Sequence, residues 1–429
     1  MTLNGERLPF GPSPFFFPHF HDRYEGIMKP VELKKDIYWV GAVDFDIRNF
    51  HHYSRSPEGS TYNAYLVCDE KNVLFDTVNV HEYGTLVKRI SEIIEPEKID
   101  YIVCNHLEQD HSGALPRMVK LCKPEKIFCS PMGYKSMTNI YDTTGWPIEI
   151  VKDGDRLNIG KRNITFLETR MLHWPDSMVS YLEEDKVLFS NDAFGQNIAS
   201  SFRFADETDH KTILNATKGY YYNIVLPYSA QVLKTLKRVT DMGLQFDVIA
   251  PDHGLIFRTP EDVAFIINTY KELAEQKPVC AAVIAYDSMW GGTAKLAEAV
   301  ADGLADEDVQ YTMYNLQDTH PSEVTTALAD AGALILGSPT RNNMPMVNMM
   351  ACIAHIKGLR PQNLVGAAFG CYGWSGEAPK MMTDALTEMK VEVVAEPVKS
   401  YFNPQEEDLA AARALGVAVA RALKEKCAQ

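Results

Sequence analysis

The chain contains the stretch Asn105-His106-Leu107-Glu108-Gln109-Asp110-His111-Ser112-Gly113, which decides how the fold is interpreted. It follows the apolar run Ile102-Val103-Cys104, typical of a buried strand, and precedes a segment that predicts a loop turning into a helix. Alternate residues of an extended segment point the same way, so we expect His106, Glu108 and Asp110 to project from one side. His111 can join them from the turn. An exposed polar loop with an incidental histidine pair is the alternative.

The spacing of these residues resembles the His-x-His-x-Asp-His loop of the metallo-β-lactamase superfamily. The chain departs from that loop at Glu108, where the second histidine normally stands. A hard, anionic carboxylate in place of an imidazole favours iron or manganese over zinc. In this respect the sequence is similar to the flavodiiron proteins. That resemblance implies an αββα sandwich for the domain that carries the motif.

Length and composition indicate a globular protein of more than one domain. The chain has 429 residues, which is long for one hydrophobic core, and 46% of them are hydrophobic. No run of about 18 apolar residues predicts a membrane span. The opening residues lack the basic and apolar segments of a signal peptide, so we expect none. A formal charge of −15 argues against nucleic acid as a partner.

The cysteines are scattered and form no Cys-x-x-Cys pair. This pattern predicts reduced thiols in a cytoplasmic protein, and it excludes a built-in rubredoxin-type or iron-sulfur site, which needs clustered cysteines. The eight cysteines are Cys68, Cys104, Cys122, Cys129, Cys280, Cys352, Cys371 and Cys427.

The pattern along the chain divides it into three parts. Residues 1–30 are rich in Pro, Phe and His and are interpreted as an N-terminal arm, in which His19 and His21 are surface residues rather than metal ligands. Residues 31–276 mix strands and helices in one α/β domain that carries the motif. Residues 277–429 alternate apolar strands with helices, which predicts a flavodoxin-like, doubly wound parallel sheet.

Three further candidate ligands each follow a strand-like run in the first domain: His173, Asp192 and His253. Alone, a histidine after a strand is more often structural, but with the motif fixed the three complete a plausible binuclear site. By resemblance to the flavodiiron proteins, His106, Glu108 and His173 hold one iron, Asp110 and His253 hold the other, and Asp192 bridges them. His111 is either a ligand or an outer hydrogen-bond donor. Asp176 and Asp252 are expected to be outer or surface groups.

Three loops of the second domain are suited to a flavin mononucleotide. The first, Ser288-Met289-Trp290-Gly291-Gly292-Thr293, joins a strand to a helix and resembles the FMN phosphate loop of flavodoxins; it has no lysine, so a nucleoside triphosphate is not expected. The other two follow later strands, and their glycines and aromatic rings suit a flat ring. Their candidate residues are Pro339, Thr340, Arg341, Asn342, Asn343, Gly370, Cys371, Tyr372, Gly373, Trp374, Ser375 and Gly376. Cys371 stands where the family usually has a hydroxyl residue, and we expect FMN binding to survive this change.

The resemblance implies an oxidoreductase that reduces O2 to water, NO to N2O, or both. FMN would relay electrons to two Fe ions from rubredoxin or a similar donor, reduced coenzyme F420 being another possibility. It also implies a head-to-tail homodimer or a dimer of dimers. The alternatives are a zinc-dependent hydrolase fused to a flavodoxin-like module and a flavin electron carrier or redox sensor. The identity of the donor is not encoded in any motif, and preference between O2 and NO depends on the shape of the substrate pocket and on the groups around the ligands.

One catalytic residue is suggested by position alone. Tyr220, Tyr221 and Tyr222 fall between Asp192 and His253 in the sequence. We take Tyr221 as the candidate that lines the substrate pocket and supplies a proton or a hydrogen bond. The alternative is a packed aromatic cluster.

Overall fold

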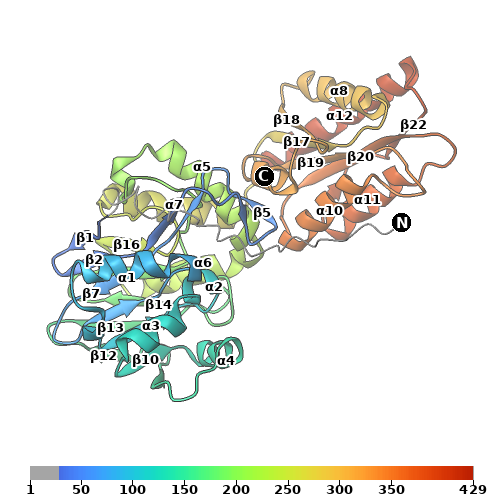
Figure 1. Ribbon diagram of the computed structural model, residues 1–429. Coiled ribbons are helices and arrows are strands. Elements are labelled where there is room, and N and C mark those ends of the chain that lie inside the picture. Colours follow the sequence, from blue (N-terminus) through green and yellow to red (C-terminus); the bar gives the residue numbers. More distant parts are fainter. Residues whose placement is uncertain (1–28, 429) are drawn as a thin grey trace, which may run out of the picture.

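The computed structural model describes residues 29–428, which form two lobes joined by a short linker (Figure 1). The predicted N-terminal arm, with His19 and His21, lies outside the described residues except for its last two positions. Within residues 29–428, no helix combines the length and the apolar character that crossing a membrane requires.

The first lobe is built on two sheets. One sheet has the order β1 (Val31–Lys34), β2 (Ile37–Trp39), β7 (Tyr65–Val67), β8 (Val73–Phe75), β9 (Tyr101–Cys104), β10 (Lys126–Cys129) and β11 (Ile148–Ile150). The other has the order β12 (Arg156–Asn158), β13 (Asn163–Glu168), β14 (Met178–Leu182), β15 (Val187–Asn191) and β16 (Val248–Pro251). Two short ribbons lie near the site: β3 (Ala42–Asp44) with β6 (Ser60–Tyr62), and β4 (Asn49–Phe50) with β5 (Ser54–Arg55).

Buried apolar residues of this lobe pack in two places: between the two sheets, and between each sheet and the helices outside it. Successive residues of a strand point to opposite faces, so each strand contributes to both. On β7, Tyr65 and Val67 join the cluster between the sheets, and the intervening Leu66 belongs to the cluster that packs against the helices. The sandwich is therefore covered by helices on its outer faces, which confirms the expected αββα architecture. These helices are α1 (Tyr83–Ser91), α3 (Leu115–Cys122), α4 (Pro131–Ile140), α5 (His210–Tyr220), α6 (Ser229–Asp241) and α7 (Pro260–Glu275).

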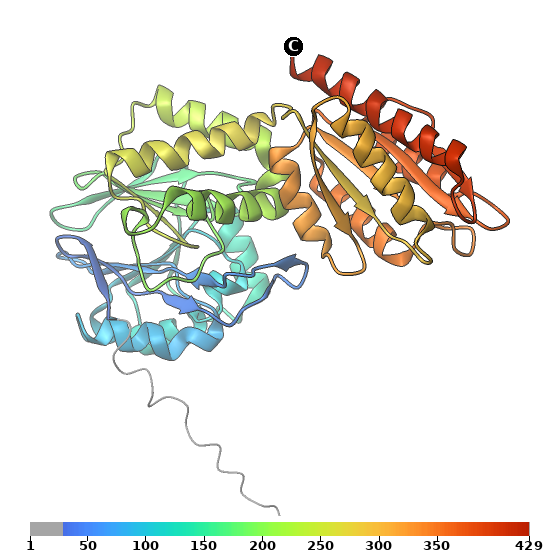
Figure 2. The ribbon, with the colours of Figure 1, turned by 90° about the horizontal axis from the view of Figure 1, so that it is seen from above.

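The second lobe contains a parallel sheet, as predicted. Its strands have the order β18 (Gln310–Asn315), β17 (Ala281–Tyr286), β19 (Ala333–Gly337), β20 (Val365–Tyr372) and β21 (Glu392–Val393), with β22 (Val398–Tyr401) also pairing with β20. Its helices are α8 (Gly292–Ala305), α9 (Pro321–Ala327), α10 (Val347–Leu359), α11 (Ala378–Glu388) and α12 (Glu406–Cys427). Seen from above, α12 runs along the outer side of the lobe (Figure 2).

The two lobes are connected between Glu275, where α7 ends, and Ala281, where β17 begins. The predicted boundary at residues 276 and 277 falls in this linker. Gln276 ties the linker to the second lobe, because its Oε1 accepts a hydrogen bond of 2.8 Å from the Gln362 backbone N–H.

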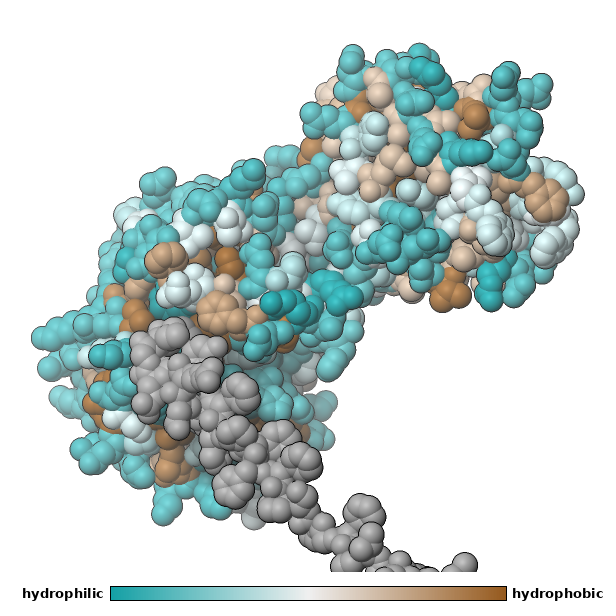
Figure 3. Space-filling model, turned by 45° about the horizontal axis from the view of Figure 1, so that its top comes forward, coloured by the Kyte–Doolittle hydropathy of each residue, from teal (hydrophilic) through white to brown (hydrophobic). Residues whose placement is uncertain are grey.

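The face shown in Figure 3 is mostly hydrophilic on both lobes, with hydrophobic residues in small groups.

Candidate metal centre and flavin site

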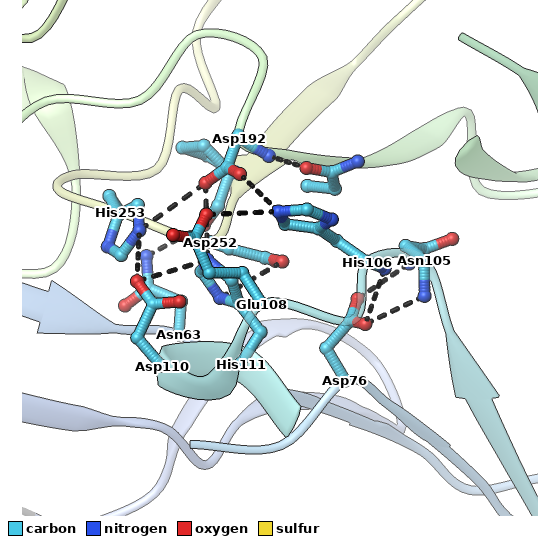
Figure 4. Close-up of polar contacts among 12 residues, drawn as sticks. Asn63, Asp76, Asn105, His106, Glu108, Asp110, His111, Asp192, Asp252 and His253 are labelled. Carbon is cyan, nitrogen blue, oxygen red and sulfur yellow. Dashed lines mark hydrogen bonds and ion pairs between the residues drawn. The ribbon is translucent and has the colours of Figure 1, made fainter. Parts of the chain in front are cut away.

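The predicted ligands of the first lobe meet at one end of the sandwich, where several strands release the chain into loops. His106 to His111 follow β9, Asp192 follows β15, and His253 follows β16. His173 lies in the loop between β13 and β14. Because β15 and β16 are parallel neighbours, their carboxyl ends meet at the same edge of the sheet. Figure 4 shows side chains from these separate loops pointing toward one another.

One group of ligand atoms comprises His106, Glu108, His173 and Asp192, all within 4.8 Å of one another. Glu108 Oε2 lies 3.4 Å from His106 Nε2 and 3.3 Å from His173 Nε2. The carboxylate that departs from the metallo-β-lactamase pattern therefore faces both histidines of its group. This arrangement can hold one metal ion.

A second group comprises Asp110, His111 and His253, again within 4.8 Å of one another. Asp110 Oδ2 lies 3.5 Å from His111 Nε2 and 3.3 Å from His253 Nε2. His111 thus stands with the candidate ligands and not behind them. The sequence had left its position open, and the geometry favours a ligand.

Asp192 lies between the two groups. Its Oδ2 is 3.2 Å from both His106 Nε2 and His173 Nε2, whereas its Oδ1 is 3.2 Å from His111 Nε2 and 3.3 Å from His253 Nε2. Each carboxylate oxygen therefore faces one group. A carboxylate placed in this way can bridge two metal ions.

The motif is not extended throughout, which differs from the sequence expectation. Residues Gln109–Ser112 form the short helix α2, and Glu108 is the last extended residue before it. The helical turn separates Asp110 and His111 from His106 and Glu108, and this places them in the second group. A turn of helix explains why adjacent residues 110 and 111 can serve the same metal.

Buried groups behind the histidines fix which ring nitrogen faces the site. His106 Nδ1 lies 3.2 Å from Asp176 Oδ2, and His253 Nδ1 lies 2.6 Å from the Thr61 carbonyl oxygen. Asp252 Oδ2 stands 3.5 Å from His111 Nδ1. These contacts leave each Nε2 turned toward the centre, as expected of outer partners of metal-bound histidines. Asp176 and Asp252 are therefore buried outer groups, which excludes a surface position for them.

The electrostatics of the site follow from packing acids and histidines together away from water. Burial alone lowers the pKa of His106, but its contacts with Asp176 and Glu108 outweigh burial and raise that pKa well above the usual value. Burial raises the pKa of Asp192, but the facing histidines, His111 first, hold it well below the usual value. In the absence of metal, protons on these histidines balance the charge of the facing carboxylates. A metal cation bound between the same atoms can replace those protons.

Two residues near the site were missed or misplaced by sequence reasoning. His51, between β4 and β5, lies with its Nε2 3.1 Å from Glu108 Oε1 at the outer side of the centre. No spacing in the sequence links it to the motif. The Tyr221 hydroxyl, which the sequence suggested for the substrate pocket, lies 3.0 Å from Ser229 Oγ. Tyr220 is the tyrosine at the site, because its hydroxyl donates a 2.9 Å hydrogen bond to Asp192 Oδ1.

The three candidate flavin loops lie at the carboxyl ends of β17, β19 and β20, hence at one edge of the parallel sheet. Gly291 has φ +85°, and α8 begins at the next residue. A left-handed residue before a helix N-terminus turns backbone N–H groups toward one point, which suits a phosphate. Trp290 and Trp374 in these loops are 92% and 78% exposed, so their rings are available to a ligand or a partner.

Cys371 lies beneath the first loop. Its side chain is buried, and a Cβ added to Gly292 would lie 3.0 Å from its Sγ. The thiol therefore packs against the backbone of the phosphate loop. The same Cβ would lie 2.9 Å from the Phe402 backbone carbonyl oxygen, so the close approach of this backbone favours glycine at position 292.

Comparison with known proteins agrees with the division of the chain into a metal-binding lobe and a flavodoxin-like lobe. A family model described as ODP family beta lactamase matches residues 61–254, and a flavodoxin model matches residues 284–416. Rubredoxin oxygen:oxidoreductase from Desulfovibrio gigas is 46% identical over 94% of this chain and 100% of its own, with a TM-score of 0.92. The flavodiiron protein from Giardia intestinalis is 31% identical over 94% and 98%, with a TM-score of 0.89. Nitric oxide reductase from Moorella thermoacetica is 41% identical over 91% and 98%.

A metallo-β-lactamase-like lobe with a carboxylate-rich binuclear centre, followed by a flavodoxin lobe, defines a flavin-linked metal oxidoreductase. Two relatives within this class, an oxygen oxidoreductase and a nitric oxide reductase, share more than 40% sequence identity with this chain over about nine-tenths of its length. The chain belongs to the flavodiiron protein family.

Proposed function

We propose that this protein reduces O2 to water, NO to N2O, or both, at a diiron centre supplied with electrons through FMN. The observation that carries the proposal is the placement of Asp192, whose two oxygens each face a separate group of histidines. The proposed ligands are His106, Glu108, His173, Asp192, Asp110, His111 and His253, with Asp192 shared.

The residues present fit two cations. Asp110 Oδ1 and Oδ2, His111 Nε2, His173 Nε2 and Asp192 Oδ2 are buried and make no hydrogen bond within the described residues. Their side chains converge on shared points without hydrogen-bond geometry, as metal ligands do. Leaving so many buried polar atoms unpaired is costly unless a cation satisfies them. A mixture of carboxylates and imidazoles suits iron or manganese, whereas a thiolate-rich set would suit zinc or an iron–sulfur cluster.

The second lobe contains groups that fit FMN. Ser288 and Thr293 are buried at the two ends of the first loop, and backbone N–H groups lie between them. Hydroxyl groups and the N-terminus of α8 can together hold a monophosphate. Loops 339–343 and 370–376, at the ends of the next two strands, would hold the ring.

Bound iron and FMN would supply the redox chemistry: FMN accepts electrons singly, and a diiron pair can bind a diatomic gas and reduce it. The protein's own residues would orient the metal ligands and hold a proton near the centre. Tyr220 orients Asp192 through its hydrogen bond. His51 lies beside Glu108 at the outer side, where its Nε2 can hold a proton close to the centre.

The proposed electron donor and the proposed assembly rest on a relative's name and on the exposed residues around the flavin loops. Rubredoxin, or a similar small electron carrier, is the proposed donor, as the name of the Desulfovibrio gigas relative states for that protein. Exposed aromatic residues at the flavin edge, namely Trp290, Trp374, Tyr401 and Phe402, favour a covering partner. We therefore propose a head-to-tail dimer in which one subunit's flavin faces the partner's metals, and a cytoplasmic location consistent with the free cysteines.

The deciding experiment combines metal and flavin analysis with stopped-flow oxidation of the reduced protein by O2 and, separately, by NO. We expect about two irons and one FMN per chain and rapid reoxidation by at least one gas, which Glu108→Gln and Asp192→Asn abolish while FMN stays bound. Zinc alone, with hydrolysis of an ester or lactam, would instead support a hydrolase. Flavin reoxidation that is equally fast in both variants would support an electron carrier.

A further inference from the structure

A cavity of about 850 Å³ lies in the first lobe between the sheet that contains β13 to β15 and the helices α6 and α7. Its lining includes His173 and Asp192, two of the proposed ligands. It also includes Met242 and Lys271, which are exposed at the end of α6 and on α7. The cavity therefore reaches from the metal centre to the outer surface of the helical layer.

The wall between these two ends is mostly apolar, and Thr169 and Ser190 are buried polar residues within it. Leu172, Val179, Leu188, Phe194 and Val232 line the cavity and are nearly buried, with exposures from 4% to 7%. Walls of this kind offer water few hydrogen-bond partners, which favours small apolar molecules such as xenon. Its volume is far larger than one diatomic molecule needs.

The other approach to the centre is polar. Glu108 and His51 form it, with side-chain exposures of 19% and 18%, and Asp110 stands 3.8 Å from His51 Nε2. Charged and titratable groups there suit protons and water. The centre thus has two approaches of opposite chemistry, one ionic and one apolar.

From this contrast we propose that the apolar cavity is the route and reservoir by which a diatomic gas reaches the metal centre. The inference rests on the proposed function, because it identifies how the substrate of that same site arrives. O2 and NO are small, uncharged and weakly hydrated, so they partition into a mostly apolar cavity more readily than ions do. The route leaves the polar approach to protons and to product water.

Xenon binding tests the cavity without any turnover. Crystals of the protein with iron and FMN bound, pressurised with xenon, are expected to show xenon between Leu188 and Val232. The Val232→Phe variant should lose that density, because the added ring occupies the same space. Absence of xenon from the cavity in the unmodified protein would overturn the proposal.

Gas kinetics test the route. In Val232→Phe we expect the second-order rate constant for reoxidation by O2 or NO to fall several-fold, with iron content and reduction of FMN by the donor unchanged. Val87→Phe is the matched control, since Val87 is a half-buried valine on the outer helix α1 and does not line the cavity. If Val232→Phe does not fold, Leu233→Phe, at a half-buried position of the same lining, replaces it.

The two proposals fail in different ways. Unmodified protein that neither gas reoxidises would overturn the proposed function. Rapid reoxidation of unmodified protein, with an unchanged rate in the variant that fills the cavity, would overturn only the gas route.

Discussion

Asp192 is the residue on which the two ligand groups depend, because each of its oxygens faces a different pair of histidines. A carboxylate can bridge two cations with two equivalent oxygens, whereas an amide presents only one oxygen acceptor. The position therefore demands an acid and not merely a polar residue of similar size. Glutamate would place the oxygens one methylene farther from the backbone.

The Asp192→Asn variant should lose iron from both groups while keeping FMN. The amide nitrogen cannot serve as a ligand, and the buried histidines lose the negative charge that they face. Metal analysis of purified protein, expressed per bound flavin, measures this loss. Asp206→Asn is the control, since that carboxylate pairs with Arg258 at the surface of the same lobe. Full iron content in Asp192→Asn would contradict the bridging role.

Tyr220 and Tyr221 provide a matched pair of substitutions. Tyr220→Phe removes the donor to the buried Asp192 carboxylate, which should cost about 1.5–3 kcal/mol of unfolding free energy and slow reoxidation by the gas. Tyr221→Phe removes only a contact with Ser229, whose hydroxyl still donates to the Leu226 carbonyl, so reoxidation should keep its rate. Denaturant unfolding and stopped-flow oxidation measure the two effects. Equal reoxidation rates in the two variants would contradict a role for the Tyr220 hydroxyl in the reaction.

The sequence could predict which side chains gather at the proposed metal centre, because each follows an apolar strand and strand ends in such a sandwich share one edge. It could not choose between Tyr220 and Tyr221. Helix α5 ends at Tyr220 and continues as a π-helix from Tyr221 to Val225, whose wider turn changes which side chain faces the sheet. His51 was missed because its approach to Glu108 depends on the hairpin of β4 and β5, and a two-residue strand leaves little pattern in a sequence.

At the scale of elements, α8 and α12 pack so closely that glycine is required on both helices. A Cβ on Gly416 of α12 would overlap the Val300 carbonyl oxygen of α8, and a Cβ on Gly303 of α8 would overlap the Arg413 carbonyl oxygen of α12. The obstacles are backbone atoms, which cannot move without shifting a helix. These helices cover the sheet that carries the flavin loops, so their spacing affects the flavin site.

Gly416→Ala should therefore destabilise the flavodoxin lobe by about 1–3 kcal/mol, because overpacking outweighs the gain in helix propensity. Gly358→Ala, on α10 of the same lobe, meets no atom within 4 Å among the described residues and should stabilise by roughly 0.5 kcal/mol. Thermal unfolding followed by flavin fluorescence compares the two. A Gly416→Ala protein as stable as the Gly358→Ala protein would contradict the close packing.

Element patterns in the sequence were sufficient for most of the architecture, and the exceptions have physical reasons. The strand β18 was not predicted, because Gln310, Thr312 and Asn315 give it a polar pattern that an edge strand tolerates. The turn α2 was predicted as extended, since four residues are too few to show a helical period. Buried strands such as β17 and β19 were recognisable as continuous apolar runs.

At the scale of the whole molecule, the two lobes are joined by the linker, by apolar packing within one cluster of buried residues from both lobes, and by a set of polar contacts. Asn223 lies at its centre: its Nδ2 donates to the Ser322 carbonyl and to Thr326 Oγ1 at 3.2 and 3.0 Å. His355 Nε2 lies 3.0 Å from Asn223 Oδ1, so His355 donates there. The Arg55 backbone N–H also donates to Ser322 Oγ at 3.1 Å. No sequence pattern indicates these polar contacts, because the residues that make them are far apart in the chain.

This interface should make docking of the lobes sensitive to pH. Burial, followed by the neighbouring His320, lowers the pKa of His355 from 6.5 to about 4. Burial and the nearby Arg55 also lower the pKa of His320. The unfolded chain binds a proton at His355 below about pH 6.5, while the folded protein resists it until about pH 4. The stability from neutral His355 is therefore complete above pH 6.5 and is lost as the pH falls from there toward 4.

His355→Gln isolates this contribution, because glutamine can still donate to Asn223 but cannot be protonated. We expect the unmodified protein to lose more unfolding free energy than the variant between about pH 7 and pH 5, with faster proteolysis of the linker near Gln276 at the lower pH. Both proteins must carry iron, so that the histidines of the metal centre are held neutral and contribute equally. If the two proteins lose stability in parallel over this range, His355 does not titrate at the interface. In the proposed head-to-tail dimer, the flavin of one subunit faces the metals of its partner only while both lobes of each chain hold their relative positions. A looser interface at low pH should therefore also slow electron delivery in the unmodified protein more than in His355→Gln.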